Sequence, residues 1–187
     1  VKADDTSYPY FSNGYYYFSE FKKKLQYKIH YRYQYNKQNK KIIFDENKFS
    51  KNFDYFSFGG YKVSPNNKFL MYTFDKDGFR NYKLEIKNLK TNKVFFSGEF
   101  NVRSFEWIDN DQVIFVIEDQ SKRAFKTLIL DLTSFKSREV FVEKDEKFSV
   151  HVYKSLDEKY LYLNSESSLT SESYYMKINR DKNFCQL

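Results

Sequence analysis

Few side chains in this sequence could carry out covalent or metal chemistry. Its two histidines are His30 and His151, and its single cysteine is Cys185. A Ser-His-Asp triad or a histidine-rich metal site would have to include one of the two histidines. His30 alternates with Lys28 and Arg32, which predicts a solvent-exposed position on the polar face of a strand. His151 stands between two valines, which favours a structural role in an inner strand.

Other motifs for metals or nucleophiles are incomplete. A lone cysteine excludes an intrachain disulfide and a cysteine-rich metal site, and it suits a reducing compartment, so we expect a cytoplasmic protein. Asp75, Asp77 and Gly78 resemble the start of a calcium loop, but no glutamate stands at the twelfth position, so a hairpin turn is predicted. None of the five glycines lies in the Gly-x-Ser-x-Gly pattern of a nucleophile elbow. We therefore predict no catalytic, cofactor-binding or metal-binding residue in this chain.

Aromatic residues are unusually abundant. Phe, Tyr and Trp make up 21% of the 187 residues, and most of the net charge of +7 lies in residues 1–60, with 11 Lys and Arg against 6 Asp and Glu. The basic, tyrosine-rich stretch from Lys22 to Tyr35 could stack on bases and contact the phosphates of single-stranded nucleic acid. The same tyrosines fit the buried face of a strand, which is the interpretation we favour. Trp107, the one tryptophan, is likewise predicted to fill the core rather than stack on a ligand.

The elements that would position these residues are nearly all strands. Aromatic residues favour pleated strands, and only two alanines are present to favour helix. In residues 27–35, tyrosines and one isoleucine alternate with polar residues, which indicates a strand with one buried face. No segment has a convincing helical period. The same alternation predicts strands at 27–35, 61–64, 69–75, 82–88, 104–107, 113–118, 126–131, 138–142, 149–154, 160–165 and 172–178.

The strands repeat as groups. Turns at 64–69, 108–113 and 155–160 each precede a long strand, and the equivalent residues Phe69, Val113 and Tyr160 are 44 and 47 residues apart. Four strands per repeat of this length are typical of a β-propeller blade, whereas a β-sandwich would not need this fixed order of turns. We predict an all-β, partial β-propeller of three to four blades of four antiparallel strands. The predicted blades are 14–45, 61–96, 104–142 and 149–187, and the outermost strand of the last is at best 184–187.

A fan of this size leaves two flanks open. The rest of a longer chain or a partner should bury them, and dimerisation through exposed blade edges is an alternative. The sequence begins at Val1 without a methionine or an apolar signal core, which we interpret as an excised piece. No run of 18 apolar residues is present, so no membrane-spanning helix is expected.

Several segments are recognisable in their order and spacing. They are Tyr8-Pro9-Tyr10 with the following Asn-Gly-Tyr-Tyr-Tyr, the stretch 54–66 with its Phe-Gly-Gly-Tyr, the stretch 81–92, Phe-Glu-Trp at 105–107, and Thr-Ser-Glu at 170–172. Together they resemble the N-terminal propeller of the oligopeptidase B (protease II) group, in the prolyl oligopeptidase family of serine peptidases. The resemblance extends from about residue 7 to residue 178.

The resemblance implies a seven-bladed parent propeller, followed by an α/β-hydrolase domain that carries the Ser-Asp-His triad and cleaves short peptides after Arg or Lys. The propeller would cover the active site as a lid and a substrate-size filter. That hydrolase domain is the predicted partner, and this chain alone is predicted to be inactive. Two other classes remain open. One is a freestanding, propeller-like protein-interaction module, and the other is the basic aromatic nucleic-acid binder, although we expect no nucleic acid, membrane or cofactor.

Overall fold

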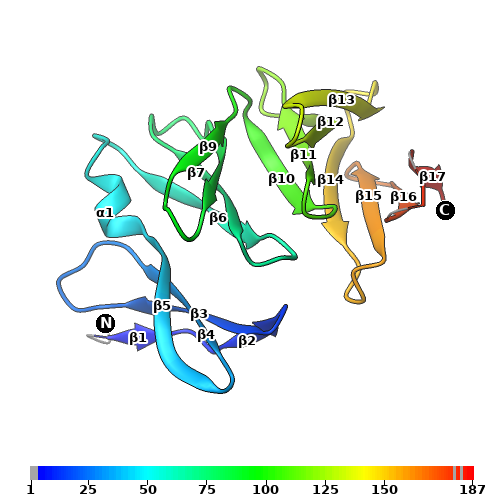
Figure 1. Ribbon diagram of the computed structural model, residues 1–187. Coiled ribbons are helices and arrows are strands. Elements are labelled where there is room, and N and C mark those ends of the chain that lie inside the picture. Colours follow the sequence, from blue (N-terminus) through cyan, green and yellow to red (C-terminus); the bar gives the residue numbers. More distant parts are fainter. Residues whose placement is uncertain (1–3, 179, 182) are drawn as a thin grey trace.

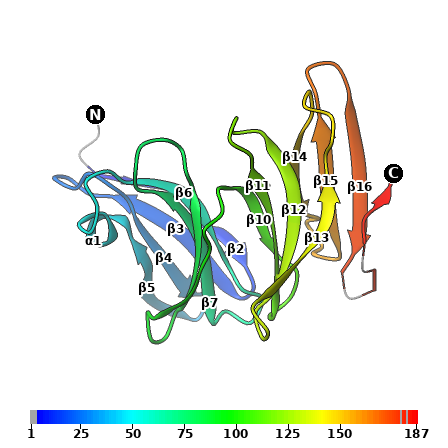
Figure 2. The same cartoon turned by 90° about the horizontal axis from the view of Figure 1, so that it is seen from above.

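The computed structural model of the chain describes residues 4–178, 180–181 and 183–187. These residues form four antiparallel sheets and one short helix. The sheets follow one another along the chain and radiate from a common inner side, so that together they form an open arc (Figure 1, Figure 2). This arrangement confirms the prediction of a partial β-propeller.

Each sheet runs from an inner first strand to an outer last strand. The first sheet contains β1 (Asp5–Thr6), β2 (Tyr10–Ser12), β3 (Tyr15–Phe21), β4 (Ile29–Gln34) and β5 (Lys37–Asp45). The second contains β6 (Ser57–Val63), β7 (Phe69–Asp75), β8 (Lys83–Asn88) and β9 (Val94–Ser97). The third contains β10 (Val102–Trp107), β11 (Gln112–Glu118), β12 (Ala124–Asp131) and β13 (Lys136–Val142). The fourth contains β14 (Ser149–Lys154), β15 (Tyr160–Glu166), β16 (Ser171–Lys177) and β17 (Cys185–Gln186).

The second strand of each middle sheet is buried on both faces, because a neighbouring sheet covers each face. In β7, Leu70 and Tyr72 pack in the cluster shared with the first sheet, whereas Met71 packs in the cluster shared with the third. In β11, Phe115 faces the second sheet and Ile114 faces the fourth. Alternating side chains of one strand therefore enter two different cores, and three such cores hold the four sheets together.

The inner turns of the second and fourth sheets have matching hydrogen bonds. Ser64 N donates to Phe69 O at 3.0 Å and Ser64 Oγ accepts from Phe69 N at 3.0 Å. Ser155 makes the same two bonds to the first residue of β15, at 2.9 and 3.0 Å. Asn67 and Glu158, each three residues after the serine, both adopt left-handed backbone with φ of 62° and 58°. The two turns are therefore equivalent, as the sequence repeat predicts.

Two local features differ from the prediction. The structure has a helix, α1 (Glu46–Ser50), which is capped by Asp45 through bonds from the amides of Asn47 and Lys48 at 3.1 and 3.2 Å. Five residues are too few for a helical period to be visible in the sequence. The turn after β10 is one residue shorter than its two counterparts, because the amide of Ile108 bonds to the carbonyl of Gln112. Within the described residues, no helix has the length and apolar character needed to cross a membrane.

Gly59 in β6 leads to the first testable prediction. A Cβ at this position would collide with Oγ1 of the buried Thr73 and lie 2.8 Å from the ring of Tyr82. We expect Gly59→Ala to lower the free energy of unfolding by about 1–3 kcal/mol, as overpacking does in cores. In the control Gly98→Ala, the new Cβ meets only ordinary contacts at 3.4 Å or more, so a change within about 0.5 kcal/mol is expected. Urea denaturation followed by circular dichroism measures both, and equal midpoints for the two variants would contradict the argument.

Candidate functional site

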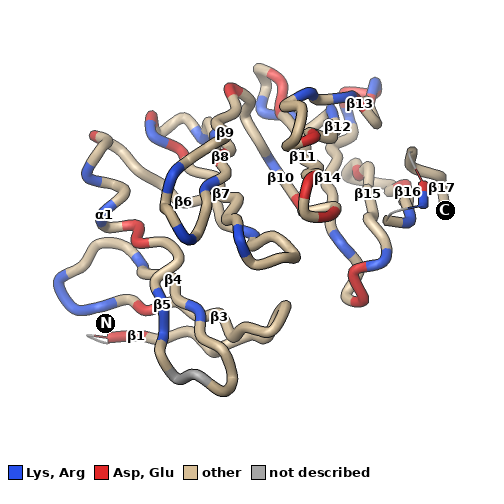
Figure 3. The backbone as a smooth tube through the Cα atoms, in the orientation of Figure 1, with Lys and Arg blue, Asp and Glu red and all other residues tan. Residues whose placement is uncertain are grey.

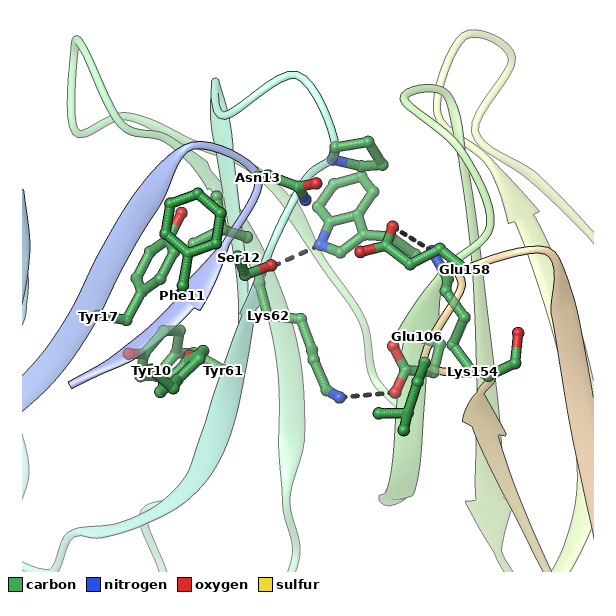
Figure 4. Close-up of a pocket in the computed structure, with 15 residues that line it drawn as sticks. Tyr10, Phe11, Ser12, Asn13, Tyr17, Tyr61, Lys62, Glu106, Lys154 and Glu158 are labelled. Atoms are coloured by element: carbon green, nitrogen blue, oxygen red, sulfur yellow. Dashed lines mark hydrogen bonds and ion pairs between the residues drawn. The ribbon is translucent and has the colours of Figure 1, made fainter. Parts of the chain in front are cut away.

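A pocket of about 430 Å³ lies between the β2–β3 hairpin and the inner strands β6, β10 and β14 (Figure 4). Basic and acidic residues are interspersed over all four sheets (Figure 3). The charged residues that line the pocket are Lys62, Glu106, Lys154 and Glu158. The pocket therefore combines charged groups with apolar side chains from all four sheets.

The four charged side chains form two ion pairs that differ in the distance between their charged atoms. Lys62 Nζ donates to Glu106 Oε1 at 2.6 Å, whereas Lys154 Nζ lies 3.9 Å from Glu158 Oε2. Glu106 and Lys154 are the deep members, with side chains 10% and 11% exposed, and Lys62 and Glu158 stand at the mouth. The deep carboxylate thus has a close cation, but the deep ammonium has only a distant carboxylate.

Electrostatics agree with this geometry. Burial lowers the pKa of Lys154, against the opposing influence of the carboxylates of Glu158 and Glu106. The neighbouring Lys62 adds to the lowering. Lys154 is therefore the charge of this pocket that its surroundings compensate least. Burial also raises the pKa of the Tyr61 hydroxyl on the pocket wall, so this ring presents a neutral OH.

Trp107 is a core residue, which confirms the prediction. Its side chain is 2% exposed and packs between the second and third sheets, with one edge on the pocket. Its ring nitrogen donates to the carbonyl of Lys62 at 3.1 Å, which joins β10 to β6. The ring also helps to form the pocket wall.

His30 is not on the surface, and that prediction is wrong. The residue is 8% exposed, and its Nε2 lies 2.6 Å from Oε1 of the equally buried Glu46 (6%). Glu46 begins α1, and the imidazole packs against Phe58 and Tyr61 of β6. Alternation along β4 predicts which residues share a face of the strand. It does not predict that α1 and the second sheet cover the polar face.

The second histidine lies apart from the first. His151 is half-buried in β14, the inner strand of the fourth sheet, as predicted, and its ring stacks on Tyr153 with centroids 5.8 Å apart. The two histidines stand in the first and fourth sheets, so the fold does not bring them together. Cys185 is exposed in β17.

The acidic turn is a hairpin, as predicted. Asp75 accepts hydrogen bonds from the amides of Asp77 and Arg80 at 3.1 and 2.8 Å, and Asp77 accepts one from Phe79 at 2.9 Å. A bond from Asn81 lowers the pKa of Asp77. These carboxylates thus bind the β7–β8 connection itself. Among the residues that the structure describes, no three His, Cys, Asp or Glu side chains are grouped as metal ligands would be.

The tyrosines of the basic segment are engaged within the first sheet. Tyr31 stacks on Phe18 and Tyr33 stacks on Tyr16, each pair with centroids 5.2 Å apart. The ammonium of Lys40 lies 4.5 Å from the Tyr31 ring centroid. These contacts favour the structural interpretation of the aromatic stretch, in which rings stack on each other rather than on bases.

Sequence reasoning missed the charged pocket. The repeat contains a signal that could have indicated it. In the antiparallel pairing, Val63 is the partner of Leu70 in the second sheet, and Lys154 is the partner of the equivalent Leu161 in the fourth. A lysine therefore occupies a position that is apolar in a sister blade, and such a departure is a reason to examine a site.

Comparisons with known proteins agree with this architecture. A family model described as prolyl oligopeptidase, N-terminal beta-propeller domain, matches residues 1–187. Dipeptidyl aminopeptidase BI of Pseudoxanthomonas mexicana is 26% identical, and Protease 2 of Moraxella lacunata is 27% identical. Each match covers 92% of this chain and 27% of the relative, so the chain spans about a quarter of the length of these curated relatives.

Solved structures give the same result. Oligopeptidase B from Trypanosoma brucei, with covalently bound antipain in a closed form, superimposes with a TM-score of 0.88 and 26% identity, over 100% of this chain and 28% of that one. Oligopeptidase B from Leishmania major superimposes with a TM-score of 0.87 and 22% identity, over 100% of this chain and 28% of that one. These findings confirm the resemblance in the sequence: the chain belongs to the N-terminal β-propeller domain family of the prolyl oligopeptidases.

Proposed function

We propose that this chain forms the first part of the propeller of an oligopeptidase B-like serine peptidase that cleaves short peptides after Arg or Lys. The observation that carries the proposal is the match to Trypanosoma brucei oligopeptidase B over the whole of this chain, at 26% identity. In this proposal, a following α/β-hydrolase domain supplies the serine nucleophile, its base and the pocket for the basic side chain. The chain itself then carries no triad and has no peptidase activity alone.

The role of this part is to act as a lid and a size filter. Such a filter needs a wall that does not open easily, and the three interlocked cores between the four sheets supply one. Short, unstructured peptides would pass the inner opening, whereas folded proteins would not. The parent enzyme would work in a reducing compartment such as the cytoplasm, in keeping with the lone Cys185.

The open flanks support membership of a larger propeller. On the free face of the fourth sheet, Tyr153 stacks on Tyr162 with centroids 5.4 Å apart, and Tyr153 is 40% exposed. On the first sheet, the rings of Phe18 and Tyr33 lie with centroids 5.9 Å apart and are half-buried, beside the buried Tyr31. In the proposed parent, further blades and the hydrolase domain cover such surfaces.

The test uses the gene product that contains this chain. Its coding sequence should continue in frame to a Gly-x-Ser-x-Gly motif followed by Asp and His. Fluorogenic dipeptides ending in Arg or Lys should give a kcat/KM at least about tenfold above those ending in Pro or Leu. A stop codon directly after Leu187 would overturn the peptidase proposal, and preference for Pro would overturn the basic specificity.

The filter role needs a second measurement. The same Arg-containing sequence is presented once as a free peptide and once in a surface loop of a stable folded protein. We expect cleavage of the free peptide and at least about a hundredfold slower cleavage of the loop. Trypsin, which has no propeller, serves as the control. It should cut both the free peptide and the surface loop. Equal rates with the peptidase would contradict the filter role.

A further inference from the structure

The pocket departs from the repeat at two positions that meet in space. The turns after β6 and β14 share their hydrogen bonds and backbone shape, yet Val63 is replaced by Lys154 and Asn67 by Glu158. The two replacing residues have opposite charges, and both line the pocket (Figure 4). The pocket therefore contains two opposite charges at positions where the turn of the second sheet has neutral side chains.

Both departures carry a cost to stability. Glu158 has a φ of 58°, a left-handed conformation that asparagine adopts more readily than glutamate. Lys154 buries an ammonium, and its side chain is only 11% exposed. Residues that weaken a fold locally are concentrated at sites where ligands bind.

The four charges of the pocket sum to zero, but its two ion pairs differ in separation. Lys62 and Glu106 neutralise each other at 2.6 Å. Glu158 lies 3.9 Å from Lys154, beyond hydrogen-bond distance, and its side chain is 46% exposed. Asp109, the other acid that acts on Lys154, already accepts bonds from the amides of its own turn. A carboxylate entering the pocket can therefore reach Lys154 by displacing a weak, solvated contact.

The rest of the pocket fits a peptide. Its volume, about 430 Å³, falls in the range of small-molecule sites. Three apolar side chains at the rim, Tyr10, Phe11 and Leu156, are 54%, 61% and 105% exposed. They offer apolar contact beside the buried cation. We propose that this pocket is a peptide carboxylate site, in which Lys154 receives the carboxylate and the apolar rim contacts the neighbouring side chain.

The pocket is formed by residues of the present chain, so the carboxylate site does not depend on the proposed peptidase function. The carboxylate could be the C-terminal group of a peptide or the side chain of an Asp or Glu within it. Both sources share the same chemistry, and the probes below distinguish them.

The experiment follows the fluorescence of Trp107, the single tryptophan, which borders the pocket. The full 187-residue chain is titrated with acetyl-Ala-Leu-Phe as the free acid, with the same peptide as its C-terminal amide, and with acetyl-Ala-Glu-Phe amide. We expect saturable binding of the free acid and at least about tenfold weaker binding of the Leu-containing amide. Binding of the Glu-containing amide would show that a side-chain carboxylate suffices, and its failure would assign the site to the chain terminus.

Variants separate a binding role from a structural one. Lys154→Met should weaken binding of the free acid at least about tenfold, whereas Lys154→Arg should retain it. Glu158→Asn, which copies Asn67, removes the competing carboxylate and should tighten binding a fewfold, an effect that a purely structural ion pair would not produce. Lys159→Gln is the matched control, because this lysine is in the same turn but 68% exposed and outside the pocket.

Circular dichroism confirms that each variant is folded. If Lys154→Met does not fold, Lys154→Arg and Glu158→Asn still test whether Lys154 binds the carboxylate. The proposal is overturned if no carboxylate peptide binds saturably, if acid and amide bind equally, or if Glu158→Asn weakens binding.

Discussion

Replacing Trp107 with alanine is expected to lower the free energy of unfolding by about 3–5 kcal/mol, the range measured for large aromatic residues in cores. The indole is 2% exposed and packs among side chains of both the second and the third sheet. Its removal leaves a cavity at that seam, and it also leaves the carbonyl of Lys62 without its indole donor. Guanidinium denaturation followed by far-ultraviolet circular dichroism measures the change, since the variant has no tryptophan.

Two further variants locate the cause of that effect. Trp107→Phe keeps most of the ring volume but removes the N–H donor. Its free energy of unfolding should therefore lie between those of the wild type and the alanine variant. Phe135→Ala removes an aromatic residue that is 52% exposed, and it should cost less than about 1 kcal/mol. A similar loss for Trp107→Ala and Phe135→Ala would contradict the assignment of Trp107 to the seam.

The second large effect is expected at the buried pair His30 and Glu46. Glu46→Ala leaves Nε2 of a histidine that is 8% exposed without its partner at 2.6 Å. Leaving a buried hydrogen-bonding group without its partner costs about 1–3 kcal/mol, and more where the group is charged. His30→Ala should be similarly damaging, because it buries a carboxylate without a partner. Thermal and urea unfolding of both single variants measure the loss.

A double variant distinguishes the pair from simple loss of packing. Replacing both partners with apolar residues, as His30→Phe with Glu46→Leu, removes both polar groups, and this combination should be more stable than either single alanine variant. Glu99→Gln is the control, because Glu99 pairs with Lys83 while its own side chain is 85% exposed, and a change within about 0.5 kcal/mol is expected. A double variant that is less stable than either single alanine variant would contradict a coupled buried pair.

Much of the fold was predictable from local patterns. Period-2 alternation identified strands such as β4, in which Ile29, Tyr31 and Tyr33 alternate with polar residues, because a strand with one covered face needs apolar residues at every second position. The continuous apolar run of β7 fits a strand with both faces covered. The serine-led turns at 64–69 and 155–160 were equivalent as predicted, since their side-chain bonds are local. The order of these units then identified the family.

The candidate site was harder to predict from the sequence. Val63 and Lys154 occupy equivalent ladder positions, so the repeat alone contained a hint that one blade carries a charge where another is apolar. The pairing of Lys62 with Glu106 spans two sheets, and no spacing along the chain predicts it. Likewise, α1 was too short for its period to be visible, and without it the partner of His30 could not be identified.

The sequence by itself therefore determined the strand pattern, the turn chemistry and the family, because each depends on residues that are neighbours along the chain or on their regular spacing. Only the tertiary structure decided that His30 is buried and that Lys154 is a poorly compensated charge in a pocket. Burial and charge compensation depend on which sheet packs on which face. That packing brings together residues from different blades, and its distances are not contained in any local pattern.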